Sequence, residues 1–306
     1  MSIQLSPVIP ARTRGDGGAF SVKSLDLDKL TRRVSPVVVL DDFRVSGQPF
    51  GPHPHAGFSA ITYVLEDSAG GLRNRDSLGN DIVVGGGGIV WTQAGSGVIH
   101  EETPADPGRE LHGLQVFVNL SSKNKLAPPR VLALDASEVP QWLSPAGDRV
   151  RVVVGSFEEV ASPLLPVEPF DFLEVDLLSE ISFGLRRAHN ALIYVLSGAM
   201  FVRANGHAQK VTREEAIALF GGRGGHVTIA ASSLARFVVL VGAEISEPVV
   251  SRGPFIMNEQ SQIDSAFARY RRGDMGRLAP RSQSRAQISA SRGPLERNQG
   301  NGGDRR

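Results

Sequence analysis

Cysteine is absent from this chain of 306 residues, and its absence removes several kinds of chemistry. Without cysteine the protein forms no disulfide bonds, holds no metal through thiolate ligands and offers no cysteine nucleophile. A metal ion in this protein would therefore depend on histidine, aspartate, glutamate or backbone oxygen. Such ligands suit Fe, Mn, Ni, Cu or Co at least as well as Zn.

Long apolar runs are missing as well. The sequence contains no uncharged apolar run of about 18 residues, the length that a transmembrane helix requires. Residues 1–16 lack an apolar segment followed by a small-residue cleavage site, which argues against secretion. We therefore expect a cytoplasmic, monomeric protein with no membrane partner.

Charge is nearly balanced over the whole chain, at a formal net value of +1, but it is unevenly distributed. Residues 276–306 contain seven arginines but only two acidic residues, Glu296 and Asp304, so the rest of the protein carries a small net negative charge. This end is rich in Ser, Arg, Gln and Gly and almost free of apolar residues. We predict that it forms a basic, disordered tail. If any part of the protein binds nucleic acid, we expect it to be this tail.

Short β-branched runs dominate the rest of the sequence. Gly, Pro, Asn and Asp separate them at intervals of roughly 8–12 residues, a rhythm typical of sandwiches and barrels. Helical periodicity is scarce, and its best example is residues 258–270, where Asn258 is placed to cap the helix. The predicted fold is therefore all-β with a short C-terminal helix. Predicted strands cover residues 36–40, 61–65, 114–118, 150–154, 192–196, 200–203 and 235–241.

A short internal sequence repeat indicates that the chain contains two copies of one barrel. The stretch Ile-Thr-Tyr-Val-Leu-Glu at residues 61–66 is matched by Leu-Ile-Tyr-Val-Leu-Ser-Gly at residues 192–198. Each stretch follows a histidine-bearing segment and precedes a turn. We place the join between the two copies within residues 121–148, where proline and polar residues gather.

The predicted organisation has three parts. Residues 1–130 form an N-terminal metal-binding barrel with an N-terminal strand extension. Residues 131–275 form a second, metal-free barrel with the closing helix, and residues 276–306 form the basic tail.

Two histidine-bearing segments carry the candidate chemistry. Since alternate residues of an extended chain face the same way, roughly 6.5–7 Å apart, His53 and His55 should point together into a barrel. By the same rule His100 and Glu102 share a face, while Glu101 points away. Three imidazoles and a carboxylate make a mixed site for one divalent first-row metal. A His-x-His pair also occurs in ordinary surface loops, and spacing alone leaves that alternative open.

These segments resemble the pirin family. Its members carry His-Pro-His-Arg-Gly-Phe before a strand, an Asp-Ser-x-Gly-Asn turn, a Gly-rich segment ending in His-x-Glu, and Gly-Leu-Gln-Leu-Trp-Val-Asn-Leu. The counterparts here are residues 53–58, 76–80, 88–102 and 113–120, with a further likeness at residues 253–258 and in the helix that follows. The resemblance spans roughly residues 30 to 278.

The resemblance implies a bicupin, in which two antiparallel double-stranded β-helix barrels stand face to face and only the first holds a metal. It also implies that His53, His55, His100 and Glu102 are the ligands. The family's metal is usually described as iron, so Fe(2+) is the expected ion, with Mn, Ni, Co, Cu and Zn as alternatives. The other histidines, His112, His189, His207 and His226, are expected to be structural or solvent-facing.

This sequence departs from the family pattern at three places. The arginine after His-Pro-His is Ala56, a frequent histidine before the Asp-Ser turn is Asn74, and a Gly-Asp pair is Gly87-Gly88. None of these changes removes a predicted ligand. We expect Ala56 and Asn74 to alter the electrostatics of the rim of the site, and Ala56 to open its mouth.

The resemblance implies two classes of function. Some relatives resemble quercetin 2,3-dioxygenases, which open a flavonol ring with O₂ and release carbon monoxide. In that case an aromatic small molecule and O₂ are the partners, and Glu102 is a ligand or the catalytic base. Gln115 and Phe117 then line the substrate cavity, although both also suit a packed barrel strand.

The alternative is a non-catalytic regulator that senses metal or redox state and binds a transcription factor or a metabolic enzyme. A cupin that catalyses another small-molecule reaction, such as isomerisation, is a third hypothesis.

Overall fold

The computed structural model describes residues 3–14, 19–48 and 50–279, and over these residues the chain is built almost entirely of antiparallel strands. All seven predicted strands are present, and the predicted all-β fold is confirmed. No helix in the described part of the chain is long and apolar enough to span a bilayer. The predicted tail lies outside the described residues from residue 280 onward.

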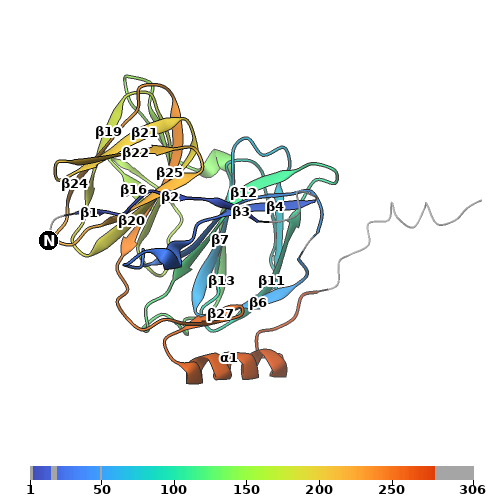
Figure 1. The fold of residues 1–306 in the computed structure, drawn as a ribbon. Coiled ribbons are helices and arrows are strands. Elements are labelled where there is room, and N and C mark those ends of the chain that lie inside the picture. The colour runs from blue at the N-terminus through green and yellow to red at the C-terminus, as the bar shows by residue number, and fades with distance from the viewer. Residues whose placement is uncertain (1–2, 15–18, 49, 280–306) are drawn as a thin grey trace, which may run out of the picture.

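Two sheets enclose the first half of the chain (Figure 1). The larger has the order β13-β10-β7-β12-β5-β4-β3 and the smaller has the order β6-β11-β8-β9. The strands of the larger sheet are β3 (Arg12–Arg14), β4 (Phe20–Ser24), β5 (Val37–Val45), β7 (Phe58–Val64), β10 (Ile89–Gln93), β12 (Leu111–Asn119) and β13 (Arg130–Leu134). Those of the smaller sheet are β6 (His53–His55), β8 (Leu72–Asp76), β9 (Asp81–Val84) and β11 (Val98–Pro104).

The second half repeats this plan. Its larger sheet has the order β1-β23-β20-β25-β18-β15-β14, with β2 also paired to β23, and its smaller sheet has the order β19-β24-β21-β22. The larger sheet contains β1 (Gln4–Leu5), β2 (Ile9–Pro10), β14 (Gln141–Leu143), β15 (Arg149–Val154), β18 (Phe170–Leu177), β20 (His189–Ser197), β23 (Glu215–Phe220) and β25 (Ala235–Ala243). The smaller contains β19 (Glu180–Leu185), β21 (Ala199–Ala204), β22 (His207–Thr212) and β24 (Gly225–Ala230).

The remaining elements are short. Two hairpins, two 3₁₀ turns and one α-helix complete the described part of the chain. They are β16 (Ser156–Phe157) with β17 (Val160–Ala161), β26 (Val250–Arg252) with β27 (Phe255–Met257), η1 (Leu27–Lys29), η2 (Ala136–Glu138) and α1 (Gln260–Arg272). Helix α1 confirms the predicted C-terminal helix, but Glu259 rather than Asn258 is its N-cap residue. The Asn258 side chain donates instead to the carbonyl oxygen of Pro248, at 2.8 Å.

Both ends of the described chain lie against the opposite barrel. Strands β1 and β2 pair with β23 of the second barrel, whereas β27 and α1 lie under the first barrel (Figure 1). Strand β13 still pairs with β10 of the first barrel, whereas β14, the next strand along the chain, pairs with β15 of the second. Strand pairing thus changes barrel within residues 135–140, while the division of the chain at residue 130 stays a prediction.

The two larger sheets pack against each other, and strand alternation decides which side chains meet there. On β7 the residues Ile61 and Tyr63 enter the core shared by both barrels, and on β20 Leu192 and Tyr194 do the same. The internal repeat noted in the sequence therefore places two tyrosines at matching positions. Tyr63 donates to Glu174 of the second barrel, and Tyr194 donates to Asp42 of the first.

The interiors of the two barrels differ. That of the second is filled with apolar side chains from both of its sheets, among them Val152, Ile193 and Phe237. The first encloses two smaller apolar clusters, one around Val64, Val90 and Leu111 and one around Phe58 and Ala60. Polar side chains and a cavity take up the remaining space, and the candidate site lies there.

Candidate metal centre

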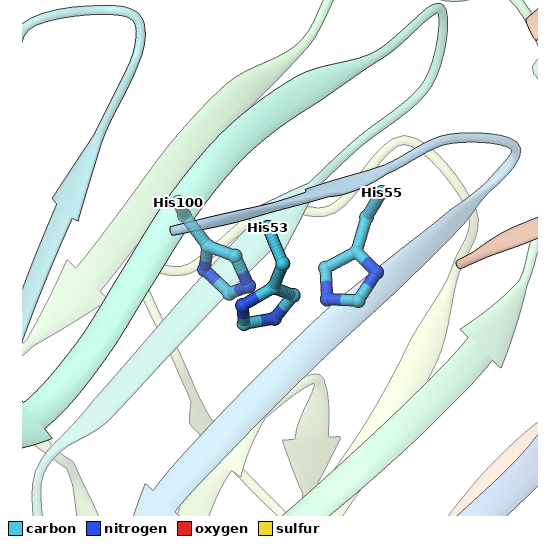
Figure 2. Close-up of side chains that lie close together, drawn as sticks. All are labelled: His53, His55 and His100. Carbon is cyan, nitrogen blue, oxygen red and sulfur yellow. The ribbon is translucent and has the colours of Figure 1, made fainter. Parts of the chain in front are cut away.

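Strand register brings the three histidines of the predicted site together. Strands β6 and β11 are antiparallel, with His53 opposite His100 and His55 opposite Val98. The alternation within β6 turns both of its histidines to the same side, and the three imidazoles meet on one face of the paired strands (Figure 2). One ligand atom from each ring lies within 4.8 Å of the other two. This spacing allows one metal ion to contact all three rings.

Hydrogen bonds orient two of these rings. Nδ1 of His53 lies 2.9 Å from the carbonyl oxygen of Gly51, and Nδ1 of His100 lies 3.1 Å from Oδ1 of Asn74. With Nδ1 as the donor, Nε2 keeps its lone pair for a metal. The buried Nε2 of His100 has no hydrogen-bond partner among the described residues. An orphaned nitrogen that faces two other imidazoles fits a metal ligand.

Burial also sets the protonation of the rings. It lowers the pKa of His55 to about 3, an effect that the neighbouring His53 strengthens. Burial, together with His55 and His53, holds the pKa of His100 well below its ordinary value. Both imidazoles are therefore neutral near pH 7, the state that binds a metal ion.

Glu102 lies in the same cavity but outside the group of three. As predicted, it shares the inward face of β11 with His100, while Glu101 on the other face pairs with Arg75 at 2.7 Å. Thr62 Oγ1 lies 2.8 Å from each carboxylate oxygen of Glu102. Burial raises the pKa of Glu102 to about 7, and the hydrogen bond from Thr62 opposes this rise. Its role as a fourth ligand stays a prediction.

A cavity of about 600 Å³ leads to the histidines. Gln115 and Phe117 line its wall, and their contact with a substrate stays a prediction. The amide of Gln115 donates to the carbonyl oxygen of Ile61 at 3.0 Å, and the ring of Phe117 contacts that of His55 at 5.5 Å between centroids. The rest of the wall is mainly apolar and consists of Phe20, Val22, Phe43, Val45, Phe50, Leu72 and Leu111.

Two site residues escaped the sequence analysis, and a third has another role than expected. Asp41 lines the cavity and Thr62 is hydrogen-bonded to Glu102, whereas Asn74 orients His100. The available signal was the Asp41-Asp42 pair within an otherwise apolar strand. Because β5 alternates, one aspartate of that pair faces the cavity and the other faces the second barrel.

Two expectations about the rim of the site were wrong. Ala56 is fully buried and packs with Phe255 and Met257 beside α1, so it lies outside the cavity wall. Asn74 is buried behind His100 rather than placed on the rim. The glycine after Ala56 has a φ of +84°, and this turn takes the chain away from the direction of β6. Ala56 therefore faces the C-terminal segment.

The other histidines lie apart from this group. His112 is buried between Asp42 and Asp67, at 3.0 and 3.2 Å, and takes the predicted structural role. His207 and His226 are exposed. In the described part of the chain, His53, His55 and His100 form the one group of candidate ligands with metal-binding spacing.

A buried lysine holds the metal-binding segment in place. Nζ of Lys125 is fully buried and donates to the carbonyl oxygens of Gly57 and Ile256, at 2.8 and 3.0 Å, and to Oδ1 of Asn119. Gly57 follows the His53–His55 strand by two residues, and Ile256 belongs to β27. Lys125 therefore ties the histidine segment to the C-terminal hairpin.

Replacing Lys125 with methionine should leave three buried acceptors without a donor. We expect the free energy of unfolding to fall by at least about 3 kcal/mol near neutral pH, as measured by urea denaturation. Lys123→Met, two residues away and exposed, serves as the control and should change the free energy of unfolding by less than about 0.5 kcal/mol. Equal stability of the two variants would contradict the role given to Lys125.

Lys125 should also contribute to the pH dependence of the free energy of unfolding. Burial lowers its pKa from 10.5 to about 8 in the folded protein. Between these two values the unfolded chain binds a proton that the folded chain lacks, so the free energy of unfolding rises with pH. This contribution reaches at most about 1.4 kcal/mol per pH unit and is absent from Lys125→Met. Parallel pH profiles of the two proteins would rule it out.

Comparison with known proteins agrees with this architecture. Residues 19–118 match the family model "Pirin", and residues 173–276 match "Pirin C-terminal cupin domain". A pirin-like protein of Solanum lycopersicum is 34% identical and covers 87% of this chain and 90% of its own. Pirin-like protein 2 of Arabidopsis thaliana is 33% identical, over 79% of this chain and 76% of its own.

Among solved structures, a quercetin 2,3-dioxygenase from Acinetobacter baumannii is 26% identical. It superposes with a TM-score of 0.78 and covers 90% of this chain and 99% of its own. The two barrels described above are thus cupin barrels, and the fold is a bicupin. With two matching domain models and relatives above 30% identity over most of its length, the chain belongs to the pirin family.

Proposed function

We propose that this pirin is a metal-dependent dioxygenase that acts on a flavonol-type substrate, such as quercetin. His53, His55 and His100 hold one divalent transition metal, for which Fe(2+) is our first choice. Glu102 serves as a fourth ligand or as the base. The reaction adds O₂ to the flavonol, opens its heterocyclic ring and releases carbon monoxide.

One observation carries the proposal, namely the cavity that leads to the three histidines. Its volume, about 600 Å³, lies in the range of small-molecule sites, and its wall is mainly apolar and aromatic. A flat aromatic compound suits such a wall. The quercetin 2,3-dioxygenase from Acinetobacter baumannii, which shares this fold over nearly its whole length, supports the same activity here.

The residues of the chain have distinct tasks in this proposal. When bound, the metal supplies Lewis acidity that lowers the pKa of a coordinated hydroxyl group. Glu102, oriented by Thr62, accepts the proton that the substrate hydroxyl loses. Phe117 packs beside His55, and the apolar wall excludes water from the reacting ring.

The test is turnover of quercetin. Purified protein is loaded separately with Fe(II), Mn(II), Ni(II), Co(II) or Cu(II) under O₂, and loss of the near-ultraviolet quercetin band is followed together with carbon monoxide release. We expect turnover with at least one metal and a fall of roughly 10²–10⁴-fold in Glu102→Gln. Glu110→Gln, which changes a half-exposed carboxylate of the first barrel outside the cavity, is the control and should leave turnover unchanged.

Metal content separates the two roles of Glu102. If Glu102→Gln keeps the metal but loses turnover, Glu102 acts as the base; if the metal is lost as well, Glu102 is a ligand. Absence of turnover with every metal, combined with specific capture of a transcription factor or a metabolic enzyme, would reject the dioxygenase and favour the regulator.

A further inference from the structure

A row of four polar residues runs across the larger sheet of the first barrel, and two of them line the cavity. Cα pairing places Ser24 opposite Asp41, Asp41 opposite Gln115, and Gln115 opposite Thr62. The four residues thus stand side by side on the adjacent strands β4, β5, β12 and β7. Asp41 and Gln115 both line the cavity, and Thr62 contacts Glu102 across it.

The two ends of this row differ in what they contact. At one end Thr62 is hydrogen-bonded to Glu102, on the strand that also carries His100. Asp41 lies two strands away, which corresponds to roughly 9–10 Å at the usual spacing between strands. A hydroxyl group bound at Asp41 would therefore lie away from the carboxylate of Glu102.

Asp41 is a hydrogen-bond acceptor in mainly apolar surroundings. Phe43 and Val45 lie on the same face of its own strand, and Phe20 and Val22 lie on the neighbouring strand β4. Burial raises the pKa of Asp41, and both a hydrogen bond from the Ser24 hydroxyl and the positive charge of Arg14 oppose this rise. An ionised carboxylate offers about four acceptor sites and no donor, so a hydroxyl group is the partner that suits it.

Gln115, the neighbour of Asp41 in the row, is less free to reorient its side chain toward a ligand. The side-chain amide of Gln115 donates to the carbonyl oxygen of Ile61, which fixes its orientation. A negative charge at Asp41 would also repel an anionic group at that end of the cavity. Charge and hydrogen bonding at this position therefore favour the same ligand, a neutral compound with a hydroxyl group.

We propose that Asp41 determines substrate specificity by accepting a hydrogen bond from a hydroxyl group remote from the three histidines. The proposal rests on the proposed function and narrows it to flat, neutral aromatic compounds that carry a hydroxyl group at the end opposite the metal. Asp41 acts in binding and takes no part in proton transfer at the metal.

Equilibrium binding in the absence of O₂ provides the test. Two flavonols serve as probes: quercetin, and 3-hydroxyflavone, which keeps the 3-hydroxyl and 4-carbonyl groups but lacks every other hydroxyl. Dissociation constants are measured by tryptophan fluorescence quenching and calorimetry, with the protein loaded with the metal that it retains best. The variants are Asp41→Asn, which keeps a neutral acceptor, and Asp41→Leu, which keeps a similar volume without any acceptor.

We expect the two Asp41 variants to weaken the binding of quercetin to different degrees and not to weaken the binding of 3-hydroxyflavone appreciably. The Kd for quercetin should rise about 3-fold in Asp41→Asn and at least about 10-fold in Asp41→Leu. The Kd for 3-hydroxyflavone should change less than about 2-fold in Asp41→Asn and should stay equal or fall in Asp41→Leu. Asp28→Asn, at an exposed position outside the cavity, should leave both constants unchanged.

Two results would contradict the proposed role of Asp41. Only the second would also contradict the proposed flavonol function. If both probes bind the wild-type protein and the Asp41 variants weaken both equally or neither, Asp41 is not the specificity determinant, and the proposed function is unaffected. If neither probe binds the metal-loaded wild-type protein, the flavonol function falls, and the role of Asp41 falls with it.

Discussion

Substitution of His100 by alanine is expected to remove the metal from the protein. His100 is buried, it faces both other imidazoles, and its Nε2 has no hydrogen-bond partner in the described part of the chain. Changing a residue that merely supports a metal ligand costs about 10–100-fold in affinity, so loss of a ligand should cost at least about 100-fold. Metal content after dialysis, measured by plasma emission spectroscopy, should fall from about one equivalent per chain to background.

Two measurements show whether that loss is specific. His226→Ala, which removes an exposed histidine from the second barrel, should keep the full metal content. In thermal unfolding, each protein is compared with its own metal-free form, and added metal should stabilise the wild type but not His100→Ala. Retention of a full equivalent by variants at His53, His55 and His100 would reject the proposed centre.

The second large effect is expected at the contact between the barrels, where Glu174 is surrounded by donors. Its side chain is 1% exposed and accepts from Tyr63, from Arg151 at 3.2 Å and from Arg236 at 2.9 Å. Glu174→Gln keeps the shape but removes the fully buried one of the two carboxylates beside the buried Arg151, the other being Glu66 at 3.4 Å. Loss of one partner of a buried pair costs about 3–5 kcal/mol, and since Glu66 stays beside Arg151, the free energy of unfolding should fall by up to that amount.

An exposed ion pair offers a matched control. Glu180 lies 3.4 Å from Arg203, and both side chains are more than half exposed, at 55% and 53%. Because water screens such a pair, Glu180→Gln should change the free energy of unfolding by no more than about 0.5 kcal/mol. If chemical denaturation gives equal losses for the two substitutions, Glu174 does not stabilise the interface in the way described.

The contrast between the barrels explains why only one of them offers a site. Matching strands put Thr62 and Ile193 on the inward faces of their sheets, but Thr62 contacts Glu102 of the cavity wall, whereas packed apolar side chains surround Ile193. The outward faces of the same strands carry Tyr63 and Tyr194, which join the barrels. The shared strand pattern therefore preserves the interface, while the inward positions differ between the two copies.

Local sequence determined the strands and the direction of the side chains within them. Alternation with a period of two was enough to predict that His53 and His55 share a face, and that His100 and Glu102 face opposite to Glu101. The resemblance to pirins added the bicupin architecture, which the comparisons confirm. These features depend on neighbours in the chain or on motifs that are continuous in sequence.

Tertiary structure alone decided the contacts between strands that are distant in the sequence. The register of β6 against β11 brings the histidines within reach of one metal ion, and long-range packing places Asn74 behind His100 and Lys125 beneath Gly57. It also turned Ala56 toward the C-terminal segment rather than the cavity. Local periodicity carries no information about register, because register is set by the summed packing and hydrogen bonding of whole sheets.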